Sequence, residues 1–288
     1  MAIIGLLDID GHNYPNLALM KLSAFHKSRG DCVEFATMFE HYDIIYKSKV
    51  FTWTPDNEYA YNTDATMAGG TGYGFMDLWL NDEVDLMCPD YSLYGCQHAY
   101  GFLTRGCIRK CPWCFVPEKE GDIFPYSDID DFLSGFSSAV LMDNNVLAHE
   151  HGIKQIEKII KKKIRIDFNQ GLDARLIDDS IARLLSRVKW ISGIRLACDT
   201  ESSIDPVRKA IEALRWENYN GPISVYVLVK DIDEAIKRIR FLKGMKVDPF
   251  AQAYRDKAGN APTEDQKRLA RWVDHKAIFK SVKWSEYR

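Results

Sequence analysis

The chain has 288 residues, of which 46% are hydrophobic and 27% are charged, and its formal net charge is −3. This ordinary globular composition excludes a disordered, collagen-like or coiled-coil protein. No apolar run approaches the roughly 18–20 residues of a membrane-spanning helix, so we expect no membrane span. The first hundred residues are strongly acidic and the remainder is net basic, which predicts two units with different surfaces.

The sequence contains seven cysteines, so the redox state of the protein's compartment decides whether they can form disulfides. The segment 1–10 has no basic stretch and turns acidic, so it does not resemble a secretory signal. We therefore expect a cytoplasmic protein, in which thiols stay reduced. An odd number of cysteines in such a protein favours metal ligands, catalytic groups or small buried residues over disulfides.

Apolar runs and helical spacing in the first part of the chain predict a small parallel-sheet unit. We expect strands at 3–7, 32–36 and 43–51 and a helix at 16–29. Glycines make the segment 66–74 a predicted loop, and breaker residues make 81–96 a predicted connector.

From residue 97 onward, strand and helix patterns alternate with a steady period. Strands are expected at 99–104, 138–142, 164–168, 193–198, 222–229 and 246–252. Helices are expected at 128–136, 150–162, 176–188, 203–217, 231–242 and 264–279. Such alternation predicts right-handed crossovers and a parallel sheet. Six units are fewer than the eight of a closed barrel, so we expect an open, partial (β/α)6 TIM-like barrel.

Three cysteines form the most specific motif of the sequence, with the spacing Cys107-x-x-x-Cys111-x-x-Cys114. They follow the first strand of the alternating region, and the C-terminal ends of parallel strands are where such folds bind ligands. Clustered thiolates select zinc or an iron–sulfur cluster. Structural zinc would need a fourth ligand, for which His98 is the nearest candidate. Three ligands alone leave one corner of an iron cluster open to a cofactor or substrate.

This motif, with Trp113 before its last cysteine, resembles the radical S-adenosylmethionine superfamily. The resemblance implies that Cys107, Cys111 and Cys114 hold a 4Fe–4S cluster whose fourth iron binds S-adenosylmethionine. It also implies reductive cleavage of that cofactor to methionine and a 5′-deoxyadenosyl radical, with the electron supplied by a flavodoxin or ferredoxin. The cofactor supplies the difficult chemistry, and the protein orients it and excludes water.

The resemblance also implies that S-adenosylmethionine lies along the strand ends, beside polar side chains of this sequence. We expect contacts from Trp113, Asp143, Asn144, Asn169, Gln170, Asp173, Arg175 and Asp199. The family's common Gly-Gly-Glu is absent from the second strand end. The same asparagines and aspartates are also ordinary helix N-caps, which is the structural alternative.

The first residues resemble a shortened, flavodoxin-like cobalamin-binding domain of the kind that precedes many radical S-adenosylmethionine cores. Asp10 and His12 follow the first strand, and Gly69 and Gly70 follow a later one. The resemblance implies His12 as a cobalamin ligand supported by Asp10, although Pro15 stands where the motif has glycine. We expect a cobalamin-domain-like unit at 1–80, a connector at 81–96 and the radical S-adenosylmethionine core with a C-terminal helical extension at 97–288.

The end of the chain, 267–288, interleaves basic and aromatic residues. Such a pattern suits a nucleic acid or nucleotide substrate, and it equally suits a final amphipathic helix packed on the core. Two alternatives to the main interpretation remain: a cobalamin-dependent methyltransferase using the same cluster, and a nucleic-acid-binding protein with a structural metal site. The sequence names neither the substrate nor catalytic residues beyond the cofactor site.

Overall fold

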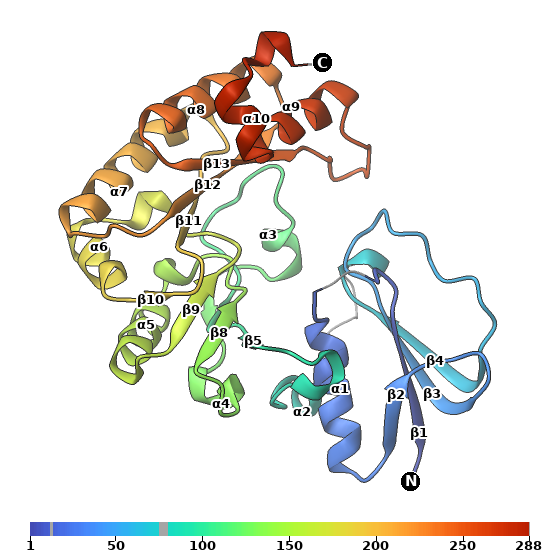
Figure 1. Cartoon of the computed structure of the whole chain (residues 1–288). Coiled ribbons are helices and arrows are strands. Elements are labelled where there is room, and N and C mark those ends of the chain that lie inside the picture. Colours follow the sequence, from blue (N-terminus) through green and yellow to red (C-terminus); the bar gives the residue numbers. More distant parts are fainter. Residues whose placement is uncertain (12–13, 75–79, 288) are drawn as a thin grey trace. The chain divides into compact units, whose positions relative to one another are not determined.

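The computed structural model describes residues 1–11, 14–74 and 80–287. It is a mixed α/β protein with parallel sheets, and it divides into two compact units (Figure 1). The first unit contains residues 1–101 with 130–136, and the second contains 102–129 with 137–288. Over the described ranges, no helix combines the length and the apolar character needed to cross a membrane.

The sheet of the first unit has four parallel strands in the order β2-β1-β3-β4. They are β1 (Ile3–Asp8), β2 (Cys32–Phe35), β3 (His41–Ser48) and β4 (Asn62–Gly69). The strands expected at 3–7, 32–36 and 43–51 are confirmed within a few residues. Helix α1 (Leu17–Ser28) is also confirmed, and it begins where the side chain of Asn16 accepts the backbone N–H of Leu19 at 3.3 Å.

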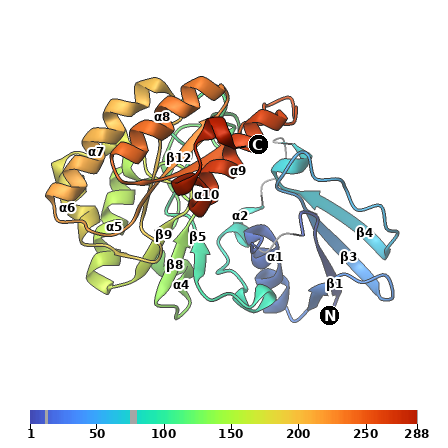
Figure 2. The ribbon, with the colours of Figure 1, turned by 45° about the horizontal axis from the view of Figure 1, so that its top comes forward.

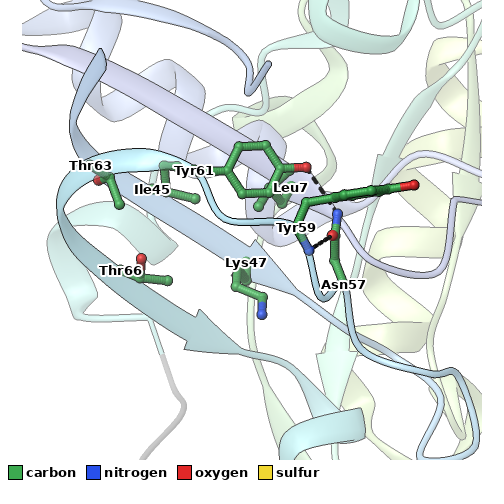
Figure 3. Close-up of a pocket in the computed structure, with 8 residues that line it drawn as sticks. All are labelled: Leu7, Ile45, Lys47, Asn57, Tyr59, Tyr61, Thr63 and Thr66. Carbon is green, nitrogen blue, oxygen red and sulfur yellow. Dashed lines mark hydrogen bonds between the residues drawn. The ribbon is translucent and has the colours of Figure 1, made fainter. Parts of the chain in front are cut away.

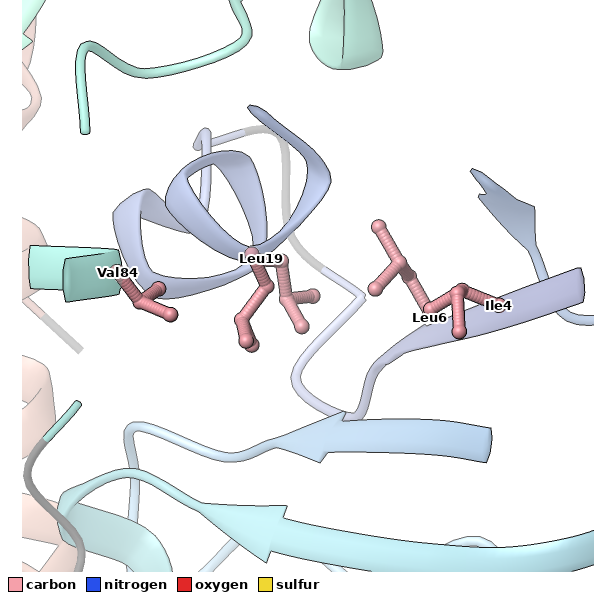
Figure 4. Packing of buried hydrophobic residues seen from close by; sticks show 5 residues of the cluster. Ile4, Leu6, Leu19 and Val84 are labelled. Atoms are coloured by element: carbon pink, nitrogen blue, oxygen red, sulfur yellow. The ribbon is translucent and has the colours of Figure 1, made fainter. Parts of the chain in front are cut away.

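Alternating side chains of β1 divide the hydrophobic core of the first unit between the two faces of the sheet. Ile4 and Leu6 pack against Leu19 of α1 and Val84 (Figure 4). Leu7 points to the other face and packs with Tyr42 and Ile45 of β3.

The expectation of a glycine-rich loop over 66–74 is wrong in its first half. Thr66, Met67, Ala68 and Gly69 complete β4, because they pair in parallel with the end of β3. The turn begins only at Gly70, which has a φ of +97° and would place a Cβ atom 2.4 Å from the carbonyl oxygen of Lys49. This glycine is therefore needed for a close approach between two backbone segments.

The segment 81–96 is more ordered than the connector that we expect from its sequence. It contains the short helix α2 (Asp82–Asp85) and the 3₁₀ turn η2 (Tyr91–Tyr94), and it leads into β5 (Ala99–Gly101). Val84 of α2 belongs to the core shown in Figure 4. The Tyr91 hydroxyl donates a hydrogen bond of 2.5 Å to the carbonyl oxygen of Phe132 in α4 (Ile129–Leu133).

The second unit contains two parallel three-stranded arrays and a short antiparallel ribbon. The arrays follow the orders β10-β9-β8 and β11-β12-β13. Their strands are β8 (Ser138–Leu141), β9 (Arg165–Phe168), β10 (Lys189–Trp190), β11 (Ile194–Ala197), β12 (Ile223–Val229) and β13 (Asp248–Ala253). The ribbon pairs β6 (Thr104–Arg105) with β7 (Phe124–Pro125).

Helices line one side of these strands, as Figure 2 shows for α5, α6, α7 and α8. Their bounds are α5 (Glu150–Lys162), α6 (Asp179–Ser186), α7 (Ile204–Trp216) and α8 (Ile232–Gly244). The chain closes with α9 (Glu264–Asp274) and α10 (Lys276–Ser281). The alternating strand–helix order is confirmed, and with it the parallel α/β class.

Several predicted boundaries are wrong for local reasons. The strand expected at 99–104 is two short pieces, β5 and β6, and the helix expected at 128–136 stops before Ser134 and Gly135, which have positive φ angles. The last helix is broken at His275, whose φ of −80° and ψ of 86° are not helical.

A parallel bridge from Leu172 to Leu196 lies between β9 and β11, and Arg195 of β11 forms an ion pair with Asp167 of β9. These contacts place the ends of the two arrays beside each other. The partial barrel itself stays a prediction.

A small pocket of about 110 Å³ lies in the first unit, on the sheet face that carries Leu7 and Ile45 (Figure 3). Its rim is polar and aromatic, with Lys47, Asn57 and Tyr61 among the lining residues. The amide of Asn57 donates a hydrogen bond of 2.9 Å to the Tyr61 hydroxyl. Neither Asp10 nor Gly69 lines this pocket.

Gly193 supplies a stability test, because its φ is +118° and a Cβ atom would lie 2.4 Å from the carbonyl oxygen of Pro222. Gly193→Ala should destabilise the second unit by about 2 kcal/mol and lower its melting temperature by roughly 5 °C. Circular dichroism melting measures this. The control is Gly244→Ala at the end of α8, where a Cβ atom meets nothing within 4 Å. Equal melting temperatures for the two variants would contradict the strain at Gly193.

Candidate cofactor site

The three cysteines lie on one loop that runs from β6 to α3 (Val116–Lys119) and returns to β7. The β6–β7 ribbon closes its base through the pairs Thr104↔Pro125 and Arg105↔Phe124. Above the ribbon, the N–H of Cys107 donates to the carbonyl oxygen of Gly121 at 3.2 Å. The loop is thus a closed unit whose base fixes the start of the cysteine motif.

Glu120 clamps the neck of this loop. Its side chain is only 4% exposed, and it accepts the Arg105 guanidinium at 2.9 Å and the N–H of Gly106 at 2.8 Å. The Asn144 side-chain amide adds a third donor at 2.9 Å. A buried carboxylate is strongly unfavourable without such partners, so these donors hold the neck in one arrangement.

Gly106 makes the clamp sterically possible. It has a φ of +77°, and a Cβ atom would lie 2.2 Å from the carbonyl oxygen of Asp122. The guanidinium of Arg105 also lies over the Phe102 ring, 4.1 Å from its centroid, in a cation–π contact.

The sulfur atoms of the loop accept hydrogen bonds from nearby N–H groups. Cys107 Sγ accepts the backbone N–H of Arg109 at 3.3 Å and the side-chain amide of Asn145 at 3.5 Å. Cys114 Sγ accepts the N–H of Val116 at 3.4 Å. Hydrogen bonds to cysteine sulfurs are one way in which a protein tunes a bound iron–sulfur cluster.

Burial disfavours the thiolate form of two of the cysteines. It raises the pKa of Cys111 and the pKa of Cys114, and the neighbouring cysteine thiolates raise both further. The positive charge of Arg175 opposes the shift at Cys111. Clustered thiolates therefore need a cationic centre among them, because metal binding replaces the protons.

Asp173 is the centre of a charged network beside the loop. It accepts Arg109 Nε at 2.8 Å and Arg175 Nε at 2.7 Å, and the amide of Asn145 at 3.4 Å. Burial alone would raise the pKa of Asp173, but the two guanidinium groups lower it. Asp173 therefore stays ionised and ties the cysteine loop to the loop after β9.

Asp143 and Asn144, which follow β8, hold the cysteine loop in this structure. The buried carboxyl group of Asp143 accepts the N–H of Thr104 at 2.6 Å and the Thr104 hydroxyl at 2.7 Å. It also accepts the N–H of Leu103 at 3.1 Å. Asn144 donates to Glu120. Contact of either residue with S-adenosylmethionine stays a prediction.

The remaining predicted contacts occupy the same strand ends. The carbonyl oxygen of Asn169 accepts the Tyr226 hydroxyl at 2.7 Å, while its buried side-chain oxygen has no protein partner. Gln170 is exposed and Trp113 is half-buried within the cysteine loop. Asp199 follows β11, and its negative charge raises the pKa of Cys111. Burial raises the pKa of Asp199 itself, and the positive charge of Arg175 opposes this shift.

In the first unit, the side chain of Asp10 accepts hydrogen bonds from neighbouring residues of the same unit. Its oxygens accept the N–H of Val50 and the hydroxyl of Thr54, both at 2.6 Å. Gly69 and Gly70 support backbone contacts with Lys49. His12 lies outside the described residues, so its cobalamin role stays a prediction.

The aromatic residues near the C-terminus pack on one another. Trp272 is buried and lies 4.9 Å from the Phe279 ring and 5.7 Å from the Trp284 ring, centroid to centroid. The Arg268 guanidinium stacks on Trp284 at 4.9 Å. This is the packing expected of an amphipathic end segment.

The donor set fits an iron–sulfur cluster. All three thiols are free of disulfides, and two of them accept N–H groups. In the parts of the chain that the structure describes, no three His, Cys, Asp or Glu side chains converge on a single metal position. A cubane cluster does not require such convergence, because each cysteine binds a different iron.

Sequence reasoning missed Glu120 and Asn145. Glu120 follows the last cysteine without any motif of its own, and only the folded ribbon brings it to Gly106. Asn145 is the third residue of the polar run that follows β8, and it is only 3% exposed. The repeated asparagine was a usable signal, whereas the role of Glu120 had none.

Comparison with known proteins gives only distant matches. No family model matches the sequence, and no curated protein matches it. SuiB of Streptococcus suis bound to S-adenosylmethionine is 14% identical, with a TM-score of 0.43 over 64% of this chain and 44% of that chain. SuiB bound to precursor peptide SuiA is 14% identical, with a TM-score of 0.45 over 64% and 46%. The chain spans less than half the length of these structures, and the similarity concerns the fold alone.

Glu120→Gln should loosen the neck of the cysteine loop. The neutral amide removes the negative charge that faces Arg105, and its NH2 group turns a donor toward one of the three donors that the carboxylate accepts. We expect a local loss of about 2 kcal/mol, or roughly thirty-fold faster proteolysis of 106–121 in the cofactor-free protein. The control is Glu118→Gln, an exposed partner of Lys257, which should change little. Identical cleavage rates for both variants would contradict the clamp.

The buried carboxyl group of Asp143 should make the stability of the folded protein depend on pH. Burial raises the pKa of this carboxyl group to about 6, whereas an unfolded aspartate has a pKa of about 3.9. Between these values the folded protein keeps a proton that the unfolded chain releases, so this contribution to stability falls as the pH rises from about 4 to about 6.

Asp143→Asn removes this titration. Denaturant unfolding of the wild type and the variant at several pH values should therefore show a stability difference that changes between pH 4 and 6 and is constant above. Asp179→Asn, at an exposed position, serves as the control. A pH-independent difference for Asp143→Asn would show that the carboxyl group does not titrate there.

Proposed function

We propose that this protein is a radical S-adenosylmethionine enzyme whose cluster is held by Cys107, Cys111 and Cys114. The observation that supports this most directly is the closed loop that carries all three thiols on the side of the strand ends, with N–H groups donated to Cys107 and Cys114. When bound, the cluster and S-adenosylmethionine supply reductive cleavage of the sulfonium to methionine and a 5′-deoxyadenosyl radical.

The protein's own residues hold and shield this site. Glu120 keeps the loop closed, and Asp173 fixes Arg109 and Arg175 beside the sulfur atoms. Two guanidinium groups near an anionic cluster and a carboxylate-bearing cofactor provide favourable charge. Trp113, half-buried in the loop, presents an aromatic surface for adenine.

The strand ends supply the groups for the rest of the cofactor. We assign Asn169, Gln170 and Asp199 to its hydroxyl and amino groups. Asn169 carries a buried side-chain oxygen that has no protein partner, and a hydroxyl donor of the cofactor would satisfy it. Asp143 and Asn144 act mainly through the loop that they hold.

The substrate and reaction type stay open within this proposal. A flavodoxin or ferredoxin is the proposed electron donor. Trp272 and Phe279 give no added support to a nucleic acid or nucleotide substrate, because both are buried. We propose 97–288 as the catalytic core. Cobalamin binding by 1–80 belongs to the alternative of a cobalamin-dependent methyltransferase, and a cobalamin-binding assay tests it.

Metal analysis and cofactor turnover test the function. Anaerobically prepared protein should contain about four iron and four sulfide per chain, and after reduction it should convert S-adenosylmethionine to 5′-deoxyadenosine. Cys111→Ala should lose both properties, because one cluster ligand is missing. Cys32→Ala, at an exposed cysteine of β2, should keep both. Stoichiometric zinc without iron would overturn the proposal in favour of a structural metal site.

A further inference from the structure

Arg238 of α8 is a charged side chain that is only 1% exposed. Burial lowers the pKa of this guanidinium, and the negative charge of Asp199 opposes that shift. Removing such a charge from water is energetically costly, and an apolar side chain of similar volume fills a core with less penalty. Core packing alone therefore does not account for a guanidinium at this position.

Its hydrogen bonds connect α8 to the ends of two neighbouring strands. Arg238 donates to the carbonyl oxygen of Cys198 at 2.7 Å and to that of Leu228 at 3.1 Å. Cys198 directly follows β11, and Leu228 lies near the end of β12. One side chain thus holds two backbone segments at the edge where the cysteine loop lies.

The bond to Cys198 changes the ladder between the two strands. Cys198 N–H donates to the carbonyl oxygen of Tyr226 at 2.8 Å, so a regular parallel ladder would continue with Leu228 N–H donating to the carbonyl oxygen of Cys198. In this structure Arg238 donates to that oxygen instead. The Leu228 N–H donates to the side chain of Asp199 at 3.1 Å.

We propose that Arg238 is a positioning residue: by drawing the Cys198 carbonyl oxygen out of the strand ladder, it leaves the Leu228 N–H to fix the carboxyl group of Asp199 at the cofactor site. The inference rests on the proposed function, because Asp199 then contacts a hydroxyl or amino donor of S-adenosylmethionine. Without the guanidinium, the ladder can close by one more bond and Asp199 loses its anchor.

Binding measurements test the coupling between the two residues. Arg238→Met keeps much of the stem volume and should weaken equilibrium binding of S-adenosylmethionine to the reconstituted protein about ten-fold. Asp199→Asn should weaken it similarly, and the double variant should bind about as well as Asp199→Asn alone. Arg240→Met, at an exposed arginine on the same helix, is the matched control and should bind as the wild type does.

Two results would overturn the inference at this stage. One is wild-type affinity in Arg238→Met, and the other is losses that multiply in the double variant. If Arg238→Met does not fold, Arg238→Lys replaces it, because one ammonium group cannot reproduce the guanidinium fork that reaches both carbonyls. A partial loss of affinity, absent in the Asp199→Asn background, is then expected.

A crystal structure of the cofactor-free Arg238→Met protein separates this inference from the proposed function. The Leu228 N–H should donate to the carbonyl oxygen of Cys198, with the Asp199 carboxyl group released. Retention of the Leu228–Asp199 bond would overturn the positioning role even if the cofactor binds. Absence of cofactor binding by the wild type would instead overturn the proposed function and the role of Asp199 in it.

Discussion

The arrangement of the site depends on closure of the cysteine loop around the buried carboxylate of Glu120. Three donors from different parts of the chain converge on it: Arg105 before the loop, Gly106 at its neck and Asn144 after β8. A buried carboxylate with one donor missing is costly, so the three segments stay together. This constraint places three thiols on a fixed backbone before any metal binds, which lowers the entropy lost on binding.

The strand ends around the loop use buried charges in the same way. Asp143 accepts the backbone N–H groups of Leu103 and Thr104. Asp173 pairs with two arginines. Arg238 donates to the carbonyl oxygens of Cys198 and Leu228. Asp143 and Arg238 each give backbone groups a side-chain hydrogen-bond partner, whereas Asp173 links side chains of two loops. These contacts lie at the place where ligands bind in parallel α/β folds.

Periodicity predicted the strand–helix order, and the cysteine motif predicts where the cofactor site lies. Both depend on local patterns, such as the apolar alternation of β12 and the spacing from Cys107 to Cys114. The extent of β4 was not predictable locally, because pairing with β3 extends the strand over small residues such as Ala68 and Gly69. The clamp at Glu120 and the ladder change at Arg238 arise from contacts between distant segments, which no local pattern records.

The central claim is that three cysteines hold a four-iron cluster and leave one iron for S-adenosylmethionine. Mössbauer spectroscopy of protein reconstituted with ⁵⁷Fe tests it most directly, because it resolves the individual iron sites. The account predicts a 4Fe–4S spectrum in which one iron of the four changes its parameters when S-adenosylmethionine is added, while the other three do not. A spectrum without a four-iron cluster, or one in which no site responds to the cofactor, would contradict it.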